Sequence, residues 1–158
     1  MDNAKIKTLI ENLITSMGVK LDAVEIKEDS ITNRTVFVIK TPESGLLIGE
    51  GGETFQALNH VIKRSVLKGM DESSPILFAI DVNDYQSSMI DKIKTKAGIL
   101  ANRARDLKSD VEMEPMSSYE RLVVHDALSN EKGIRTESTG LGRERRVIIK
   151  YIGDSVSI

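Results

Sequence analysis

The chain has 158 residues, 40% apolar and 29% charged, a balance typical of a folded globular protein and not of a disordered chain. It has no cysteine, which excludes disulfides and thiolate metal sites, and its two histidines, His60 and His125, are too few for a zinc cluster. We therefore expect no metal and no cofactor. The sequence shows no signal-peptide pattern and no apolar stretch of membrane-spanning length, so we expect a cytoplasmic protein without membrane insertion.

Positive charge is concentrated near the C-terminal end, although the formal net charge of the chain is −2. Residues 1–82 carry 9 basic and 12 acidic side chains, whereas residues 83–158 carry 13 basic and 12 acidic ones. Residues 131–150 hold six basic and three acidic side chains, a local net charge of +3. Such a segment indicates either a local anionic ligand or a solvated charged hairpin, and both interpretations stay open.

The first half of the chain shows alternating helical and strand patterns that predict a two-layer α/β sandwich over residues 1–82. The elements predicted there are a helix at 4–17, strands at 21–28 and 34–40, a short helical turn after Pro42, a helix from Phe55 to about Gly69, and a strand at 74–82.

The second half predicts another small α/β module over residues 83–158, so the fold class is α+β with two sandwich modules. We expect Asn83 and Asp84 to cap a long helix whose apolar stripe is Tyr85, Met89, Ile93, Ala97, Leu100 and Ala104. A short strand or an extended segment follows at 111–116, and then a helix to about Ser129 that Ser117 and Glu120 open as a capping box. Two strands joined by a turn at Gly140 to Gly142 end the module.

A glycine loop, Gly49-Glu50-Gly51-Gly52, precedes the amphipathic helix of the first module, where exposed backbone N–H groups suit a phosphate. No Gly-Lys-Ser/Thr follows, which excludes a Walker loop, and a dinucleotide-binding spacing needs a glycine where Thr54 stands. The loop fits the GxxG of a KH domain, which clamps the backbone of about four nucleotides of a single strand. A glycine turn that merely begins a helix is the alternative.

Arg121 and His125 lie four residues apart and therefore on one face of the predicted helix. An arginine offers a charged planar fork for phosphate, and an imidazole can donate a hydrogen bond or stack on a base. The alternative is a partly buried structural pair beside Val124 and Leu128.

The segments LLIGEGGETFQALNHVIKR, EPMSSYERLVVHDAL and TESTGLGRERRVIIKY together resemble the bacterial Jag/KhpB family. That family joins a KH domain to an R-three-H domain, which is named for its Arg-x-x-x-His. The resemblance extends from about Ser44 to the C-terminus. It implies a KH domain of type II order (α-β-β-α-α-β) at 1–82 and an R-three-H domain at 83–158, both binding single-stranded nucleic acid.

The resemblance also implies RNA, and by extension single-stranded DNA, as the ligand, and a bacterial regulatory role in RNA metabolism or cell elongation and division. It implies a second small KH protein or a second copy of the chain as partner. We expect no catalytic residue and no enzyme activity, since no nucleophile and base can be placed together. The residues predicted to bind nucleic acid are Gly49, Glu50, Gly51, Gly52, Arg121, His125, Arg143, Arg145 and Arg146.

Three features depart from the family's pattern. Members usually carry an additional Jag domain, which we expect this protein to lack. Glu50 and Gly51 stand where KH domains often have basic residues, and the next helix starts with Tyr85-Gln86-Ser87-Ser88 in place of a Tyr-Arg-rich segment. We therefore expect the Arg-x-x-x-His half to carry more of the binding. A protein interaction adaptor or dimerisation module, with weak or no RNA binding, is the alternative function.

Overall fold

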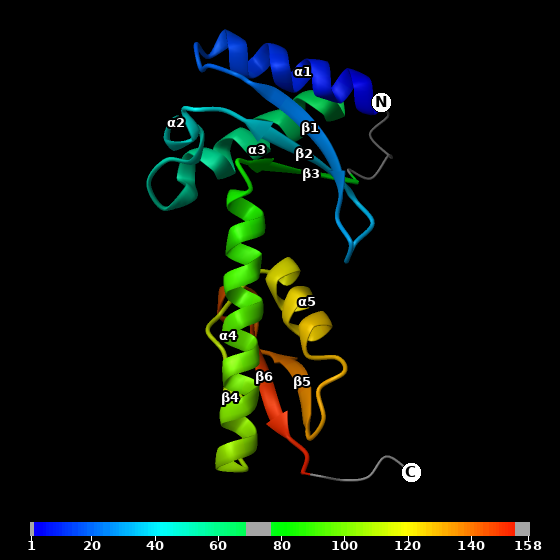
Figure 1. Ribbon diagram of the computed structural model, residues 1–158, viewed down its shortest axis with the longest axis vertical. Coiled ribbons are helices and arrows are strands. Elements are labelled where there is room, and N and C mark those ends of the chain that lie inside the picture. Colours follow the sequence, from blue (N-terminus) through cyan, green and yellow to red (C-terminus); the bar gives the residue numbers. More distant parts are fainter. Residues whose placement is uncertain (1, 69–76, 154–158) are drawn as a thin grey trace. The chain divides into compact units, whose positions relative to one another are not determined.

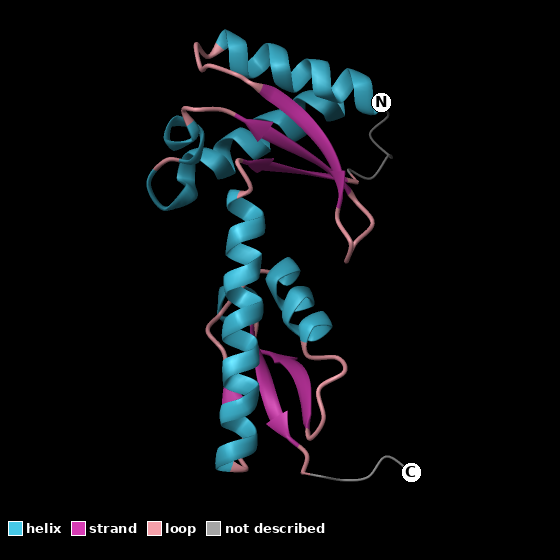
Figure 2. Cartoon of the chain, in the orientation of Figure 1, coloured by secondary structure: helices cyan, strands magenta, loops and turns pink. Residues whose placement is uncertain are grey.

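The computed structural model describes residues 2–68 and 77–153, and the chain divides into two compact units (Figure 1). We call them the N-terminal unit, Met1–Gln86, and the C-terminal unit, Ser87–Ile158. Each unit combines helices with a three-stranded sheet (Figure 2), which confirms the predicted mixed α and β character. Within the described residues, no helix is long and apolar enough to cross a membrane.

The N-terminal unit has its strands in the order β1-β2-β3, with β1 antiparallel and β3 parallel to the central strand β2. Its elements are α1 (Asn3–Ser16), β1 (Ala23–Glu28), β2 (Thr35–Lys40), α2 (Ser44–Ile48), the single 3₁₀ turn η1 (Glu50–Gly52), α3 (Glu53–Lys68) and β3 (Phe78–Val82). Gly69, where the sequence predicts the end of α3, and residues 74–76 of the predicted third strand lie outside the described residues.

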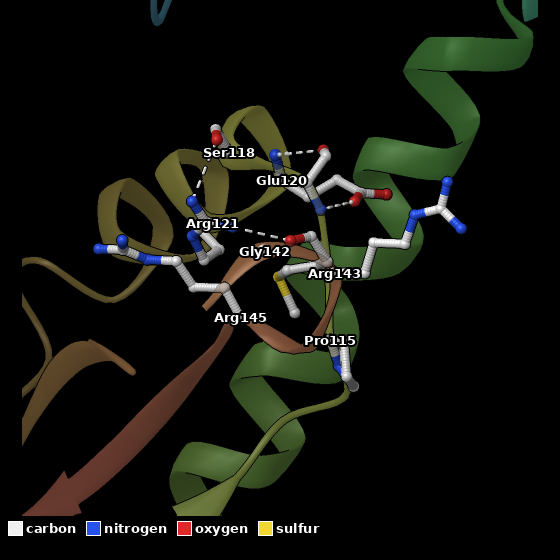
Figure 3. A pocket seen from close by; sticks show the side chains of 9 residues that line it. Pro115, Ser118, Glu120, Arg121, Gly142, Arg143 and Arg145 are labelled. Carbon is white, nitrogen blue, oxygen red and sulfur yellow. Dashed lines mark hydrogen bonds between the residues drawn. The ribbon is translucent and has the colours of Figure 1, made fainter. Parts of the chain in front are cut away.

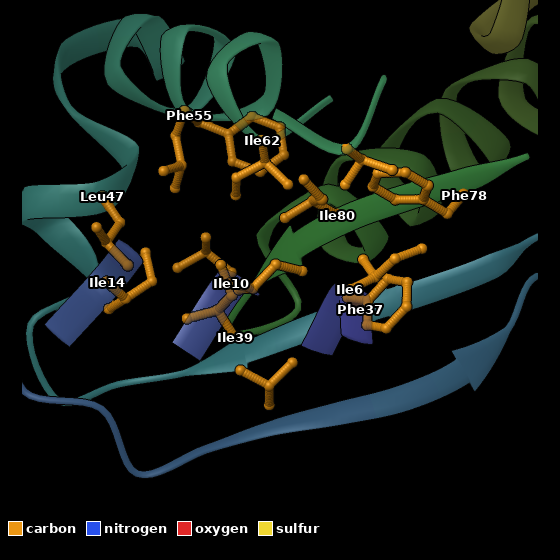
Figure 4. Packing of buried hydrophobic residues seen from close by; sticks show 14 of the residues in the cluster. Ile6, Ile10, Ile14, Phe37, Ile39, Leu47, Phe55, Ile62, Phe78 and Ile80 are labelled. Atoms are coloured by element: carbon orange, nitrogen blue, oxygen red, sulfur yellow. The ribbon is translucent and has the colours of Figure 1, made fainter. Parts of the chain in front are cut away.

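The core of the N-terminal unit forms where α1 and α3 pack on one face of this sheet (Figure 4). Ile6, Ile10 and Ile14 recur every four residues along α1, so they share one face of the helix and are all buried there. The facing strands contribute Phe37 and Phe78, whose rings meet edge to face with centroids 5.6 Å apart. This packing fixes α3 and therefore the glycine loop that leads into it.

The C-terminal unit has an antiparallel sheet in the order β4-β6-β5. Its elements are β4 (Val111–Glu112), α5 (Ser118–Ala127), β5 (Ile134–Thr139), the 3₁₀ turn η2 (Gly142–Glu144) and β6 (Arg146–Tyr151). Its first helix, α4 (Tyr85–Leu107), begins in the N-terminal unit and continues into this one. The fully buried alanines Ala97, Ala101 and Ala104 of α4 belong to one hydrophobic core with Val147 and Ile149 of β6.

Two predictions about α4 are wrong. Met89, placed on its apolar stripe, is 38% exposed, and the neighbouring Ile90 is buried in its place. Asn83 does not cap the helix, because its side chain binds the backbone of Thr41. The Asp81 carboxylate accepts a hydrogen bond from the first turn, 2.8 Å from the Gln86 amide nitrogen.

Asp84, the other residue predicted to cap α4, forms ion pairs with two lysines of the sheet. Its carboxylate pairs with Lys40 at 2.5 Å and with Lys27 at 3.1 Å. These two ammonium groups, through their hydrogen bonds above all, lower the pKa of Asp84 below its ordinary value. Long-range contacts of this kind are invisible to a local capping rule.

Candidate nucleic-acid interface

The first turn of α5 is fixed by a capping box, as the sequence predicts. The Ser117 hydroxyl accepts a hydrogen bond from the Glu120 amide at 3.3 Å, and the Glu120 carboxylate accepts one from the Ser117 amide at 2.6 Å. This exchange occupies backbone donors that the helix otherwise leaves open. The turn is therefore a rigid support for the residue that follows it, Arg121.

The Arg121 side chain folds back over this turn. Its guanidinium donates to the Met116 carbonyl oxygen at 2.8 Å and to the Ser118 hydroxyl at 3.0 Å (Figure 3). The side chain is therefore held in place while its remaining N–H groups are available. A guanidinium fixed in this way is suited to an oxygen-rich anion.

The connection between β5 and β6 lies opposite the first turn of α5, and the two segments enclose a pocket. Gly140 has a φ of +89°, and a Cβ there would lie 2.9 Å from the Glu144 carbonyl oxygen, so only glycine fits without a shift. The loop is tied by hydrogen bonds from the Glu144 amide to the Leu141 carbonyl (3.2 Å) and from the Arg145 amide to the Gly142 carbonyl (3.3 Å). The Met116 amide donates to the Arg145 carbonyl at 3.1 Å, which joins the loop to the segment before α5.

A pocket of about 740 Å³ lies between these two segments. We call it the arginine pocket, and its lining residues are Pro115, Met116, Ser117, Ser118, Glu120, Arg121, Gly142, Arg143 and Arg145. Arg143 and Arg145 are exposed, and neither makes a side-chain hydrogen bond or ion pair with any residue that the structure describes. Figure 3 shows the Arg143 side chain extending away from Arg121 and Arg145.

The charge balance of the pocket favours an anion. Three arginines line it against one carboxylate, Glu120, and that carboxylate already accepts the Ser117 amide. A positive lining in which the guanidinium groups of Arg143 and Arg145 have no partner among the described residues fits phosphate oxygens. The volume lies within the range of about 300–1,000 Å³ typical of ligand pockets.

His125 lies outside the lining of the pocket, although it shares a helix face with Arg121. Its Nδ1 is 2.7 Å from the Thr136 hydroxyl and its Nε2 is 2.9 Å from the Ser138 hydroxyl, both on β5. Partial burial, and then the charge of Arg121, lower the pKa of His125 below its ordinary value of 6.5. The ring is therefore neutral near pH 7, donating through one nitrogen and accepting through the other.

Arg146 points to the opposite face of the sheet. Its neighbour Val147 and Ile149 are buried in the core, and side chains along a strand alternate between faces. The Arg146 guanidinium binds the Glu112 carboxylate at 2.8 Å. The structure thus brings Arg121, Arg143 and Arg145 together in one pocket and leaves Arg146 out of it.

The other basic side chains of this outer face form ion pairs of their own. Lys150 lies 2.9 Å from the Glu137 carboxylate, and Arg135 lies 3.9 Å from it. The hydrogen bond from Lys150, then its charge, and more weakly the charge of Arg135, lower the pKa of Glu137. Of the two interpretations of the basic segment, the outer face corresponds to the solvated charged hairpin, while the loop with Arg143 and Arg145 stays a candidate anion site.

The glycine loop of the N-terminal unit uses its glycines in two ways. A Cβ at Gly49 would lie 2.1 Å from the Thr54 hydroxyl oxygen, and one at Gly52 would lie 3.0 Å from the Tyr85 hydroxyl oxygen. Gly51 also has a positive φ, +59°, but has open space around it. Gly49 and Gly52 are therefore needed for packing, while Gly51 and the exposed Glu50 present the loop to solvent.

Sequence reasoning missed the hydroxyls that hold His125 and the residues that complete the pocket, Pro115, Met116 and Ser118. Thr136 and Ser138 are two apart on a strand, so a shared face was a readable signal. Their pairing with His125 depends on how α5 packs on the sheet, which no local pattern contains. Among the residues that the structure describes, no group of three His, Asp or Glu side chains is placed to hold a metal ion.

The comparisons with known proteins concern the domain that contains the arginine pocket. Residues 92–151 match the R-three-H domain family, and the arginine pocket lies within that range. The chain is 31% identical over 142 residues to the RNA-binding protein KhpB of Clostridium symbiosum, covering 89% of the chain and 62% of that relative. It is 26% identical over 147 residues to KhpB of Bacillus subtilis, covering 92% and 68%, and 30% identical over 109 residues to KhpB of Lactiplantibacillus plantarum, covering 69% and 33%.

The chain thus spans about three fifths of the length of the first of these relatives. The similarity to it and to the Bacillus subtilis protein extends beyond the matched domain, since it covers about nine tenths of this chain. Residues 92–151 thus match the R-three-H domain, and over most of its residues the chain is similar to the RNA-binding proteins named KhpB.

Proposed function

We propose that this protein binds single-stranded RNA and that the arginine pocket of the C-terminal unit is its principal contact. The observation that carries the proposal is that Arg143 and Arg145, exposed and unpaired among the described residues, join Arg121 in one pocket of the matched domain. Phosphate contacts from arginine supply most of the affinity for nucleic acid. The relatives above are each named an RNA-binding protein, which supports RNA over other polyanions.

The residues of the site divide into ligands and supports. Arg143 and Arg145 bind phosphates, and Arg121, held by Met116 and Ser118, binds a third oxygen-rich group at a fixed position. His125 acts indirectly, because its two hydrogen bonds hold β5 against α5. This is binding without a chemical step, so no enzyme activity is proposed.

We also propose that the loop Gly49–Gly52 makes a second, weaker contact of the KH type. Its support is the open space at Gly51, where a phosphate can approach the backbone. The exposed carboxylate of Glu50 repels that phosphate and makes the contact weak. The bacterial regulatory role, and a second small KH protein or second copy as partner, are part of the proposal through the resemblance.

Fluorescence anisotropy tests the main proposal, with 12-nucleotide single-stranded RNA, the matching DNA strand and an RNA duplex as probes. Arg143→Gln with Arg145→Gln should weaken single-strand binding roughly tenfold and make the salt slope shallower by about 1.4, the counterions of two phosphates. Arg103→Gln with Arg135→Gln removes the same charge outside the pocket and should change affinity by less than about threefold. Equal losses of affinity in both double variants would show that binding depends on overall positive charge and not on the arginine pocket.

An adaptor function is the second candidate, and Glu50 is the observation that favours it, because a carboxylate faces solvent in the middle of the glycine loop. It predicts a wild-type protein that binds none of the three nucleic acid probes above background. Analytical ultracentrifugation would then show whether the chain associates with itself.

A further inference from the structure

Leu141 is the most solvent-exposed of the large apolar side chains in the described residues, with 85% of its surface accessible. It stands at the β5–β6 connection between Gly140 and Gly142, beside the arginine pocket. Single exposed apolar residues are common on protein surfaces and need no function. The position of Leu141 has to be argued from how its loop is built and from what surrounds it.

The loop holds Leu141 outward through its own backbone structure. The tight contact of Gly140 with Glu144 turns the chain, and the Leu141 carbonyl accepts the Glu144 amide at 3.2 Å. Leu141 itself has φ −127° and ψ 144°, an extended conformation open to any residue. The side chain is therefore presented to solvent on a backbone fixed on both sides, so little conformational entropy is lost when a ligand covers it.

The surroundings of Leu141 supply phosphate contacts but no aromatic ring. Arg143 and Arg145 follow it within four residues, and both have free guanidinium groups among the described residues. The pocket lining contains Pro115 and Met116 but no Phe, Tyr or Trp. A single strand held by its phosphates exposes unstacked bases. Their faces are apolar, so covering them with an apolar side chain is favourable.

We propose that Leu141 is a base-contacting residue, covering the face of one base of a single strand whose phosphates lie on Arg143 and Arg145. This rests on the proposed function and adds to it the contact that distinguishes nucleic acid from a bare polyanion. Every base has an apolar face, so this contact tolerates any sequence but requires that bases be present and unpaired.

The first test compares oligouridylate of 12 nucleotides with an abasic strand of the same length and charge. Leu141→Ser should weaken oligouridylate binding about fivefold, the loss expected when part of a leucine surface is no longer covered, and leave the salt slope unchanged. On the abasic strand the same variant should bind as the wild type does. Leu107→Ser is the matched control, since Leu107 is 59% exposed in the same unit and does not line the pocket.

The second test uses the absence of tryptophan from the chain. Leu141→Trp introduces a single reporter at a position whose backbone accepts it. Oligouridylate should quench its fluorescence and bind more tightly to this variant than to the wild type, because an aromatic ring stacks on bases better than leucine does. The abasic strand should bind without quenching.

The possible results separate the two proposals. If the wild type binds oligouridylate, but Leu141→Ser binds it equally well and Leu141→Trp is not quenched, the base contact is wrong while the RNA-binding function stands. If the wild type does not bind oligouridylate at all, both are wrong. A blue shift of the Leu141→Trp emission with vesicles of phosphatidylglycerol, and none with oligouridylate, would overturn the base contact in favour of a membrane surface.

Discussion

Arg121 and His125 show how two residues on one helix face acquire different roles. Helical spacing correctly puts them side by side, and the charge of Arg121 contributes to lowering the pKa of His125. Arg121 nevertheless lines the pocket, whereas both nitrogens of His125 are occupied by Thr136 and Ser138. That His125 touches the ligand itself stays a prediction, and the geometry favours a positioning role.

The first prediction concerns pH and His125. Its pKa is lowered in the folded protein by burial and by Arg121, so just below pH 6.5 the unfolded chain binds more protons than the folded one. The stability that the neutral ring contributes is therefore present above pH 6.5 and lost as the pH falls toward the folded pKa. Melting temperatures between pH 7.5 and 5.5 should fall for the wild type and fall less for His125→Gln.

His60→Gln is the control for that series, because His60 is the other histidine of the chain and its side chain is exposed. It should follow the wild-type curve. Parallel curves for the wild type and His125→Gln would show that folding does not lower the pKa of the ring. The carboxylates with lowered pKa, Asp84 and Glu137, lose their contributions only in more acidic solution.

The second prediction concerns the charge in the glycine loop. Glu50→Lys should tighten single-strand binding and steepen the salt slope by about 0.7, one further counterion released, if the loop approaches a phosphate. Gly51→Asp should weaken binding without unfolding the protein, since the position is open and aspartate tolerates a positive φ better than most residues. Salt titrations of oligonucleotide binding measure both effects.

Glu28→Lys is the matched control for Glu50→Lys. Glu28 is exposed and belongs to the same unit. It is the last residue of β1, whereas the other end of that strand, Ala23, pairs with Lys40, the residue that leads toward the glycine loop. The change in net charge is identical. If Glu28→Lys and Glu50→Lys have the same effect, or if neither has any, the loop makes no specific phosphate contact.

At the scale of elements, the sequence predicts what depends on local spacing and misses what depends on packing. The α1 helix and the capping box of α5 follow from periodicity and from Ser117 with Glu120, and both are confirmed. Met89 is exposed because the direction of a helix stripe is set by what the helix packs against. That Arg146 points away from the core could have been predicted, because side chains alternate along a strand and Val147 and Ile149 of β6 are buried.

The third prediction tests the β5–β6 connection as an element. Gly140→Ala should destabilise the protein by more than the roughly 1–2 kcal/mol that a left-handed conformation costs an ordinary residue, because its Cβ also meets the Glu144 carbonyl oxygen. Gly142→Ala has the same kind of φ but open space, and should cost only the conformational part. Urea unfolding measures the difference.

Gly140→Ala should also weaken RNA binding more than Gly142→Ala does, because it disturbs the backbone that carries Arg143 and Arg145. If the two variants are equally stable and bind equally well, the close contact at Gly140 does not shape the pocket.

At the scale of the whole molecule, the net charge of −2 means that binding depends on where charge lies and not on its total. Arg143 and Arg145 of the pocket have no ion pair among the described residues, while the basic side chains on the outer face of the same sheet are ion-paired. This distribution predicts that affinity for an anionic ligand depends on the arginine pocket and not on the net charge of the chain.

The fourth prediction concerns the use of both units on one strand. If the arginine pocket and the glycine loop both bind, the second contact forms at high effective concentration, and a 40-nucleotide strand should bind at least about tenfold more tightly than a 12-nucleotide one. Gly51→Asp, or Arg143→Gln with Arg145→Gln, should each remove most of that gain in the full chain. A gain that survives Gly51→Asp would assign all binding to the C-terminal unit.

The most direct test of the account is a ¹⁵N–¹H chemical-shift titration of the full chain with a 12-nucleotide single-stranded RNA. The account predicts that the largest perturbations fall on the amides of residues 116–121 and 140–145, which build the arginine pocket. The amides around Arg135 and Lys150, on the outer face of the sheet, should move little. Perturbations concentrated on that outer face, or absent from the pocket while the RNA is bound, would contradict it.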